Sequence, residues 1–154
     1  MSRKHRGRRE SFTVSEANAT LPLVRVIVGD LAALSREVIE RRRRLSFLMA
    51  GRDPNDGDLY HQELVQIEDE LEKDKRQLRE YVEELRAIGV ELINGPEGLV
   101  TFPSTLEDRK VCLSWKLGER EVLYWHPPGA AVADRRPLTA DLLAGRTCKT
   151  SAIR

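Results

Sequence analysis

The stretch YHQELVQIEDELEKDKRQLREYVEELRAIG, residues 60–89, decides the fold class of this 154-residue chain. An apolar stripe with one carboxylate runs through it at alternating steps of four and three residues, at Tyr60, Leu64, Ile67, Leu71, Asp74, Leu78, Tyr81, Leu85 and Ile88. This spacing puts the stripe on one side of a helix and is typical of coiled-coil packing. Gly89, followed by the apolar Val90, is expected to cap the helix. We therefore predict a long helix that packs against a second helix.

The segment before this stretch is predicted to supply that second helix. Thr13 and Glu16 have the spacing of a capping box at its start, and apolar residues recur at helical spacing along the rest of it. Pro22 lies too deep for the first turn, so we expect a short helix over 14–20, a kink, and a new long helix from Pro22 onward. A turn-rich segment then joins the two long helices into an antiparallel hairpin over 13–89.

After the hairpin, the hydrophobic period changes to two, which predicts a three-stranded antiparallel meander over 98–126. The expected strands are 98–102, 109–117 and 120–126. A two-residue type II′ turn at Gly118-Glu119 would join the last two strands. The resulting register places His126 on the apolar face of the sheet and Trp125 on the mixed face. The predicted fold is α+β: a long helical hairpin with a kinked first helix, packed on this small sheet.

We divide the chain into three parts by composition. Residues 1–11 form a basic arm that is expected to be disordered. Residues 12–138 form one α+β domain, a size that can bury a moderate core. Residues 139–154 are expected to form a short helical patch followed by a flexible tail.

The net charge and the lengths of the apolar runs limit which partners and which cellular compartment fit this sequence. Its 26 basic and 25 acidic residues give a net charge of +1, so no overall field favours nucleic acid or anionic lipid. The basic start lacks the apolar region of a secretory signal, and the longest apolar-looking run, Leu21–Val28, is too short for a membrane span. Cys112 and Cys148 are too far apart for a CxxC motif. These features predict a cytoplasmic protein without membrane contact.

Four motifs together resemble a known bacterial family. They are FTVSEANATLPLV, ELRAIGVELIN, GLVTFP and SWKLGEREVLYWH. The chain is similar, over roughly residues 11 to 138, to the family catalogued as domain of unknown function 2203. That resemblance implies a cytoplasmic setting and no particular activity. The sequence departs from the family pattern at two places: Ser114 replaces a cysteine, and AAVADRRPL lacks the usual glycines and phenylalanine. Chemistry that depends on that cysteine or on a glycine loop is therefore not expected here.

His126, at the end of the last predicted strand, is the main candidate functional residue. We interpret it as a packed histidine bonded to a backbone carbonyl or a carboxylate. The alternative is a metal site with His61, for which three or four ligands are needed. Carboxylates that could complete such a site are Glu63, Glu68 and Asp134. No HxxxH, HxH or ExxH spacing links these residues, so the sequence assigns neither a metal nor a cofactor.

Three further residues are candidates for a functional site. Trp125 is predicted to mark a ligand or partner surface, and Arg135 is a candidate anion clamp. Asp74 is interpreted as a polar seam residue that pairs with an arginine of the first helix and sets the register. In the alternative, Asp74 is a buried partner of His126.

Three functions of different classes follow from these features. The first is a non-catalytic interaction or assembly module that forms a homodimer through the hairpin or through open sheet edges. The second is a metal- or small-molecule-binding enzyme centred on His126. The third is a nucleic-acid accessory protein that uses the basic arm and the run Arg41–Arg44. We rank them in this order; the sequence leaves enzymatic activity open and makes nucleic-acid binding the least favoured.

Overall fold

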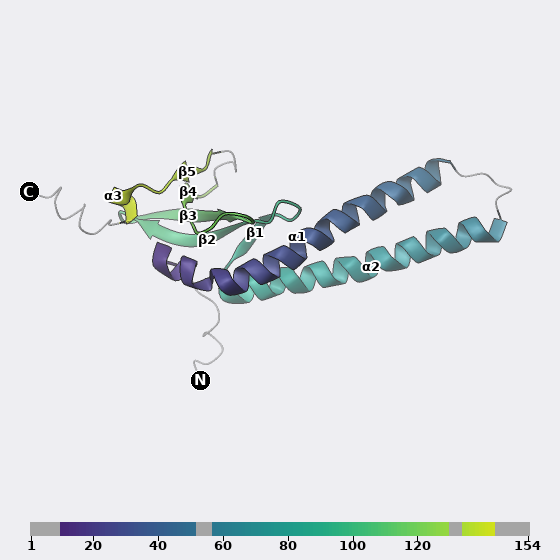
Figure 1. Ribbon diagram of the computed structural model, residues 1–154, viewed down its shortest axis with the longest axis horizontal. Coiled ribbons are helices and arrows are strands. Elements are labelled where there is room, and N and C mark those ends of the chain that lie inside the picture. Colours follow the sequence, from purple (N-terminus) through teal and green to yellow (C-terminus); the bar gives the residue numbers. More distant parts are fainter. Residues whose placement is uncertain (1–9, 52–56, 130–133, 144–154) are drawn as a thin grey trace, which may run out of the picture.

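Two long helices and a five-stranded antiparallel sheet make up the computed structural model, which describes residues 10–51, 57–129 and 134–143. The elements in chain order are α1 (Val14–Ala50), α2 (Gly57–Ile88), β1 (Glu91–Asn94), β2 (Leu99–Leu106), β3 (Arg109–Lys116), β4 (Tyr124–His126), β5 (Arg136–Pro137) and α3 (Ala140–Leu143). Figure 1 shows the sheet at one end of the hairpin, whose other end extends far beyond it. The predicted α+β class and helical hairpin are confirmed. The basic arm before residue 10 and the tail after 143 lie outside the described residues.

The hairpin begins and ends where the sequence predicts. The Thr13 hydroxyl accepts a hydrogen bond from the Glu16 amide at 3.0 Å, and the Glu16 carboxylate accepts one from the Thr13 amide at 2.9 Å. At the other end, Gly89 has a φ of 108°, a left-handed conformation that favours glycine. The Val90 amide then donates to the Leu85 carbonyl at 2.9 Å. Both caps satisfy backbone groups that a helix end leaves unpaired.

The prediction of two helical segments around Pro22 is wrong, because α1 continues through this residue. A proline inside a helix removes one backbone hydrogen bond and bends the axis. Figure 1 shows α1 changing direction within its first turns. Packing of the apolar residues on both sides of Pro22 against the sheet offsets the lost bond, so the helix bends and does not end.

The sheet has five strands where three were predicted. The four residues of β1 are too few to show a clear alternation in sequence. Strand β5 has only two residues and is defined by its pairing with β4. Strand β2 also runs through Pro103, which was expected to end it. The Pro103 carbonyl accepts from the Phe12 amide at 2.7 Å on the side where β1 no longer pairs. A missing proline N–H is tolerated at such an edge position.

The predicted register between the last two long strands is wrong by one residue. The turn is Lys116 to Glu119, closed by a bond from the Glu119 amide to the Lys116 carbonyl at 2.9 Å. Gly118 has a φ of 105° at its third position, as a type II turn requires. Strand β4 starts only at Tyr124, and His126 lies opposite Cys112. A one-residue slip exchanges the two faces, so His126 leaves the apolar face and Trp125 joins it.

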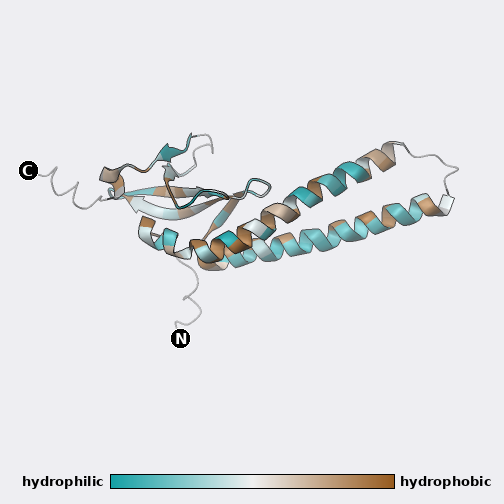
Figure 2. Ribbon diagram, viewed as in Figure 1, coloured by the Kyte–Doolittle hydropathy of each residue, from teal (hydrophilic) through white to brown (hydrophobic). Residues whose placement is uncertain are grey.

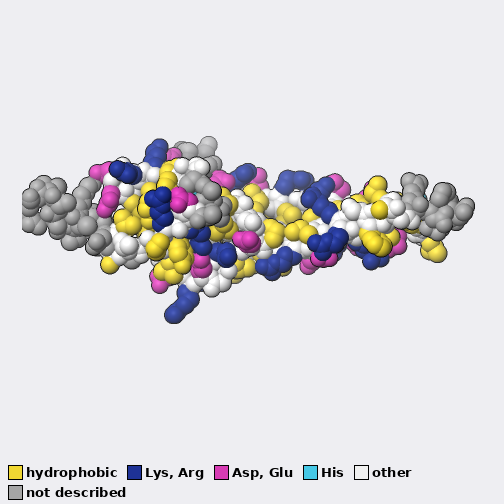
Figure 3. All heavy atoms as spheres, turned by 90° about the horizontal axis from the view of Figure 1, so that it is seen from above, with side chains coloured by type: hydrophobic (Ala, Val, Ile, Leu, Met, Phe, Trp, Pro, Cys, Tyr) yellow, Lys and Arg dark blue, Asp and Glu magenta, His cyan; other side chains and the backbone are white. Residues whose placement is uncertain are grey.

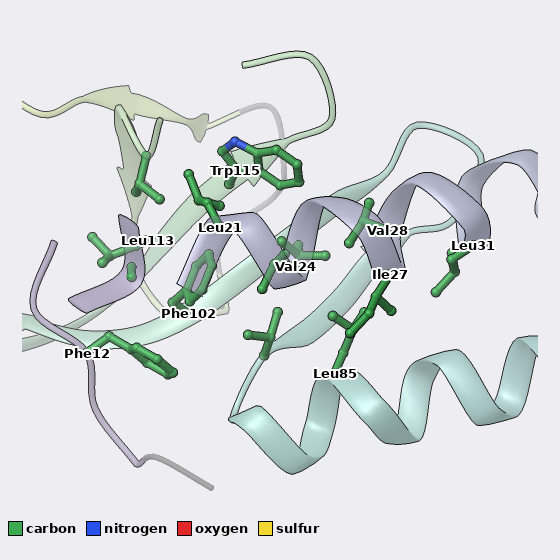
Figure 4. Packing of buried hydrophobic residues seen from close by; sticks show 14 residues of the cluster. Phe12, Leu21, Val24, Ile27, Val28, Leu31, Leu85, Phe102, Leu113 and Trp115 are labelled. Atoms are coloured by element: carbon green, nitrogen blue, oxygen red, sulfur yellow. The ribbon is translucent and has the colours of Figure 1, made fainter. Parts of the chain in front are cut away.

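The main core lies between the sheet and the sheet-proximal halves of α1 and α2. Its large members come from four elements and from Phe12, which precedes α1, and all are almost fully buried: Phe12, Phe102, Leu113 and Trp115 from the sheet side, and Leu21, Val24, Val28, Leu31 and Leu85 from the helices. Figure 4 shows these side chains converging between α1, α2 and the strands. Phe12 packs edge-on against Phe102, with ring centroids 5.2 Å apart.

Helix α1 is more apolar than the run Leu21–Val28 suggested. By length and composition alone, it contains an 18-residue window that could cross a membrane, and 39% of that window is buried. A core helix of a soluble protein also passes this test. Figure 2 shows the apolar residues of α1 concentrated beside the sheet, whereas α2 is hydrophilic along most of its length.

Candidate functional site

The outer face of the sheet, opposite the core, carries His126. Its side chain is 7% exposed, and Nδ1 lies 2.9 Å from the Pro127 carbonyl. A carbonyl oxygen can only accept, so Nδ1 is the donor in this contact. This geometry matches the predicted bond from His126 to a backbone carbonyl. It fixes the ring against the residue that follows it.

Arg135 lies on the same outer face and is fully engaged by its neighbours. Its Nε donates to the Ser114 hydroxyl at 2.8 Å, and its Nη2 donates to the Glu119 carboxylate at 2.8 Å. The guanidinium also lies 4.3 Å above the centre of the Tyr124 ring. The side chains of Arg135 and Glu119 are 18% and 19% exposed. Glu119 compensates the charge of Arg135. Through its bonds to Ser114 and Glu119, Arg135 attaches the segment after β4 to the sheet.

Cys112 lies opposite His126 and borders a surface depression of about 560 Å³. Thr101 and Pro103 line the same depression. Arg86 and Glu91 also line it and form an ion pair at 3.7 Å. Burial raises the pKa of the Cys112 thiol, so the thiol is protonated at neutral pH. A protonated thiol is a weak nucleophile and a poor metal ligand. Burial thus disfavours the thiolate of Cys112, although His126 lies opposite it in the ladder.

The structure does not bring the candidate metal ligands of the alternative hypothesis together. His61 lies in the exposed part of α2 near the far end of the hairpin, whereas His126 ends β4 at the sheet (Figure 1). Glu63 pairs with Arg44, and Asp134 pairs with Arg136 at 3.1 Å. Glu68 is exposed on α2. Within residues 10–51, 57–129 and 134–143, no three His, Cys, Asp or Glu side chains are grouped so that they could hold a metal ion.

Trp125 is partly buried and packs against the core. It lies opposite Leu113 in the β3–β4 ladder and contacts the main apolar cluster. The Arg136 guanidinium covers its ring at 5.2 Å. Sequence reasoning assigned Trp125 to the wrong face because the turn, and with it the register, was misplaced.

Ion pairs join the two helices in the part of the hairpin that projects beyond the sheet, here called the distal hairpin (residues 36–50 of α1 and 59–73 of α2). Arg41 pairs with Asp74, which is 14% exposed, and with Glu70 at 3.4 Å. Arg44 pairs with Glu63. The prediction that Asp74 pairs with an arginine of the first helix is confirmed. Arg41, Arg43 and Arg44 of this run therefore each pair with a carboxylate of the same chain.

The end of the distal hairpin exposes large apolar side chains. Leu59 is 80% exposed, Phe47 78% and Met49 57%, and smaller exposed fractions occur at Val65 and Ile39. Figure 3 shows hydrophobic side chains gathered near this end of the molecule. Sequence reasoning missed this surface because it followed only the apolar stripe between the helices. The signal was present as apolar residues that lie off the stripe.

Comparison with known proteins identifies a family for this chain but gives no activity. A protein-family model described as "Uncharacterized conserved protein (DUF2203)" matches residues 10–138, most of the chain. No curated protein and no solved structure matches it.

Proposed function

This chain belongs to the DUF2203 family of uncharacterised conserved proteins, and we propose that it is a non-catalytic cytoplasmic assembly module that forms a homodimer through its distal hairpin. The observation that carries the proposal is the exposure of Phe47, Met49 and Leu59 at one end of the molecule. Burying one such side chain contributes about 1.5–3 kcal/mol. A partner that covers several of them would therefore be held by the hydrophobic effect.

The sheet edges are poor alternatives to the hairpin as a dimer interface. Strand β1 has four residues and a register irregularity between Leu92 and Asn94. Strand β5 has two residues and ends in Pro137, which has no amide to donate. Phe12 bridges to Ser104 along the remaining edge of β2. Short strands, irregularities and prolines are the features by which sheets avoid pairing with a second sheet.

The charges around the exposed apolar residues favour a second copy over nucleic acid. Arg41 and Arg44 already pair with carboxylates of α2, and Arg43 pairs with Glu40 at 2.7 Å. Nucleic-acid binding requires basic groups that are free to neutralise phosphates. The distal hairpin instead carries both signs, which suits a copy of the same surface related by two-fold symmetry.

Light scattering coupled to size-exclusion chromatography, over a series of protein concentrations, tests the proposal. The 17.6 kDa chain should give twice that mass. The double substitution Phe47→Ser and Leu59→Ser should shift the equilibrium to monomer without lowering helix content, because both side chains are exposed. The matched control is Leu123→Ser, which changes a residue that is 42% exposed near the sheet and should leave the dimer intact. A wild-type monomer at every concentration, or a dimer that survives the double substitution unchanged, would overturn the proposal.

A further inference from the structure

A surface depression of about 570 Å³ lies where α1 meets the turn that follows β3. Arg25 of α1 lines one side of it, and Leu117, Gly118, Glu119 and Arg120 line the other. A volume of this order is typical of sites for small molecules. Because the depression is built on the sheet, it is separate from the distal hairpin and from the dimer interface proposed there.

Arg25 is held in place by uncharged groups. Its Nη2 donates to the Arg120 carbonyl at 2.6 Å, and its guanidinium lies 5.9 Å from the centre of the Trp115 ring. Trp115 is fully buried in the main core (Figure 4). Its Nε1 donates to the Glu119 carbonyl at 3.0 Å, so one indole supports both sides of the depression. A carbonyl and an aromatic ring orient a guanidinium without neutralising its charge.

The carboxylate that lines the depression, that of Glu119, is engaged by other groups. It accepts hydrogen bonds from the Lys116 amide at 3.0 Å and from Arg135 Nη2 at 2.8 Å. Within the part of the chain that the structure describes, no carboxylate forms an ion pair with Arg25 or with Arg120. The depression is therefore bordered by two guanidiniums whose charge these described residues leave uncompensated.

The free donors of these two arginines suit an oxyanion. A guanidinium has five N–H donors, and Arg25 uses one at Nη2 for the Arg120 carbonyl. Its other donors and those of Arg120 match the oxygen atoms of a carboxylate or phosphate group. Because Arg25 is already fixed by the fold, binding costs it little side-chain entropy. Leu117 adds an apolar wall beside the two charges.

We propose that this depression binds a small molecule with a carboxylate or phosphate group, which bridges Arg25 and Arg120 while its apolar part contacts Leu117. The site goes beyond the proposed assembly function and does not depend on it. Arg135, the anion clamp expected from the sequence, contributes indirectly. By holding Glu119, it keeps that carboxylate from pairing with Arg25 or Arg120.

Titration of isotope-labelled protein with inorganic phosphate, and separately with succinate, tests the site by NMR at constant ionic strength. The backbone amides of residues 117–120 and the Nε–H of Arg25 should shift and saturate together with at least one of the two anions. A response to phosphate alone identifies a phosphate ligand, and a response to succinate alone identifies a carboxylate ligand.

Substitutions of the two arginines test their roles separately. Arg25→Gln and Arg120→Gln should each raise the dissociation constant about tenfold, because each removes a charge-assisted hydrogen-bond donor. Arg120→Gln keeps the backbone carbonyl that holds Arg25, so it tests the site even if Arg25→Gln disturbs the turn. The matched control is Arg109→Gln, which removes the same charge from an exposed position at the opposite end of β3 and should leave binding unchanged.

Two results would exclude the site. One is a set of chemical shifts that saturates with neither anion. The other is a dissociation constant within about twofold of the wild-type value in Arg120→Gln or in a folded Arg25→Gln variant. The light-scattering mass of the wild type concerns only the assembly function, so a monomer in that experiment leaves this site standing.

Discussion

Near the sheet, the hairpin buries Leu31 and Leu85 completely, whereas at its far end the best-covered residues keep a small part of their surface exposed. These distal residues are Val38, Ile67 and Leu71, at 5–7%. The proximal half packs between two helices and a sheet, so side chains meet partners on several sides. The distal half has only two helices, whose cluster is small. Two helices alone cannot surround a side chain.

The two halves of the hairpin differ in the interactions that stabilise them. In the proximal half, burial of apolar surface stabilises the fold without relying on ion pairs. In the distal half, the interhelical ion pairs of Arg41 and Arg44 supplement a thin apolar seam, and ionic strength weakens partly exposed pairs. Regions with few buried contacts open locally at lower free energy. A partner that covered the distal half would therefore add stability and bury apolar surface there.

The largest effect is expected in the proximal core. Phe102→Ala should lower the free energy of unfolding by about 3–5 kcal/mol, because it removes a fully buried ring and leaves a cavity beside Phe12. Urea unfolding followed by circular dichroism measures the change. A loss below about 1 kcal/mol would mean that the proximal half is not the main source of stability.

Leu71→Ala should cost less, about 2 kcal/mol, at the low end of the range for buried leucines. Leu71 is 7% exposed and lies in the small distal cluster, which can relax into solvent. The same urea experiment, performed at a concentration where the chain is monomeric, compares the two variants directly. If Leu71→Ala proves more damaging than Phe102→Ala, the contrast between the two halves is wrong.

His126→Ala extends the comparison to the outer face of the sheet. Loss of the bond to the Pro127 carbonyl and of a buried ring should lower the free energy of unfolding by about 1–2 kcal/mol. Elemental analysis of the wild type and the variant accompanies the unfolding curves. An unchanged stability together with loss of a stoichiometric metal would favour the enzyme hypothesis centred on His126.

Tyr81 of α2, which is partly buried and packs against the main core, should give the smallest effect, visible only at alkaline pH. Burial raises the pKa of its hydroxyl, and Asp30, Glu84 and Glu80 raise it further. The folded state therefore keeps the proton to a higher pH than the unfolded state does. The stability that this provides is present below pH about 10, the ordinary tyrosine pKa, and is lost as the pH rises through the folded pKa. Tyr81→Phe should make the decline of melting temperature above pH about 10 shallower than in the wild type. An identical decline in both proteins would contradict this assignment.

Local patterns in the sequence determined the helical hairpin. The spacing from Tyr60 to Ile88, the capping box at Thr13 and the glycine cap at Gly89 act within one or two helical turns, and a helix forms from contacts at that range. The pairing of Asp74 with an arginine followed from the same seam. Residue chemistry along one stripe was enough for these predictions.

Only the tertiary structure decided the sheet register, and with it the faces of His126 and Trp125. Strand pairing is fixed by contacts between distant residues, and a turn misplaced by one residue exchanges the faces. The continuous path of α1 through Pro22 and the short strand β5 also depend on neighbours from elsewhere in the chain. A sequence specifies which side chains are apolar, and the folded chain decides which of them are left in water.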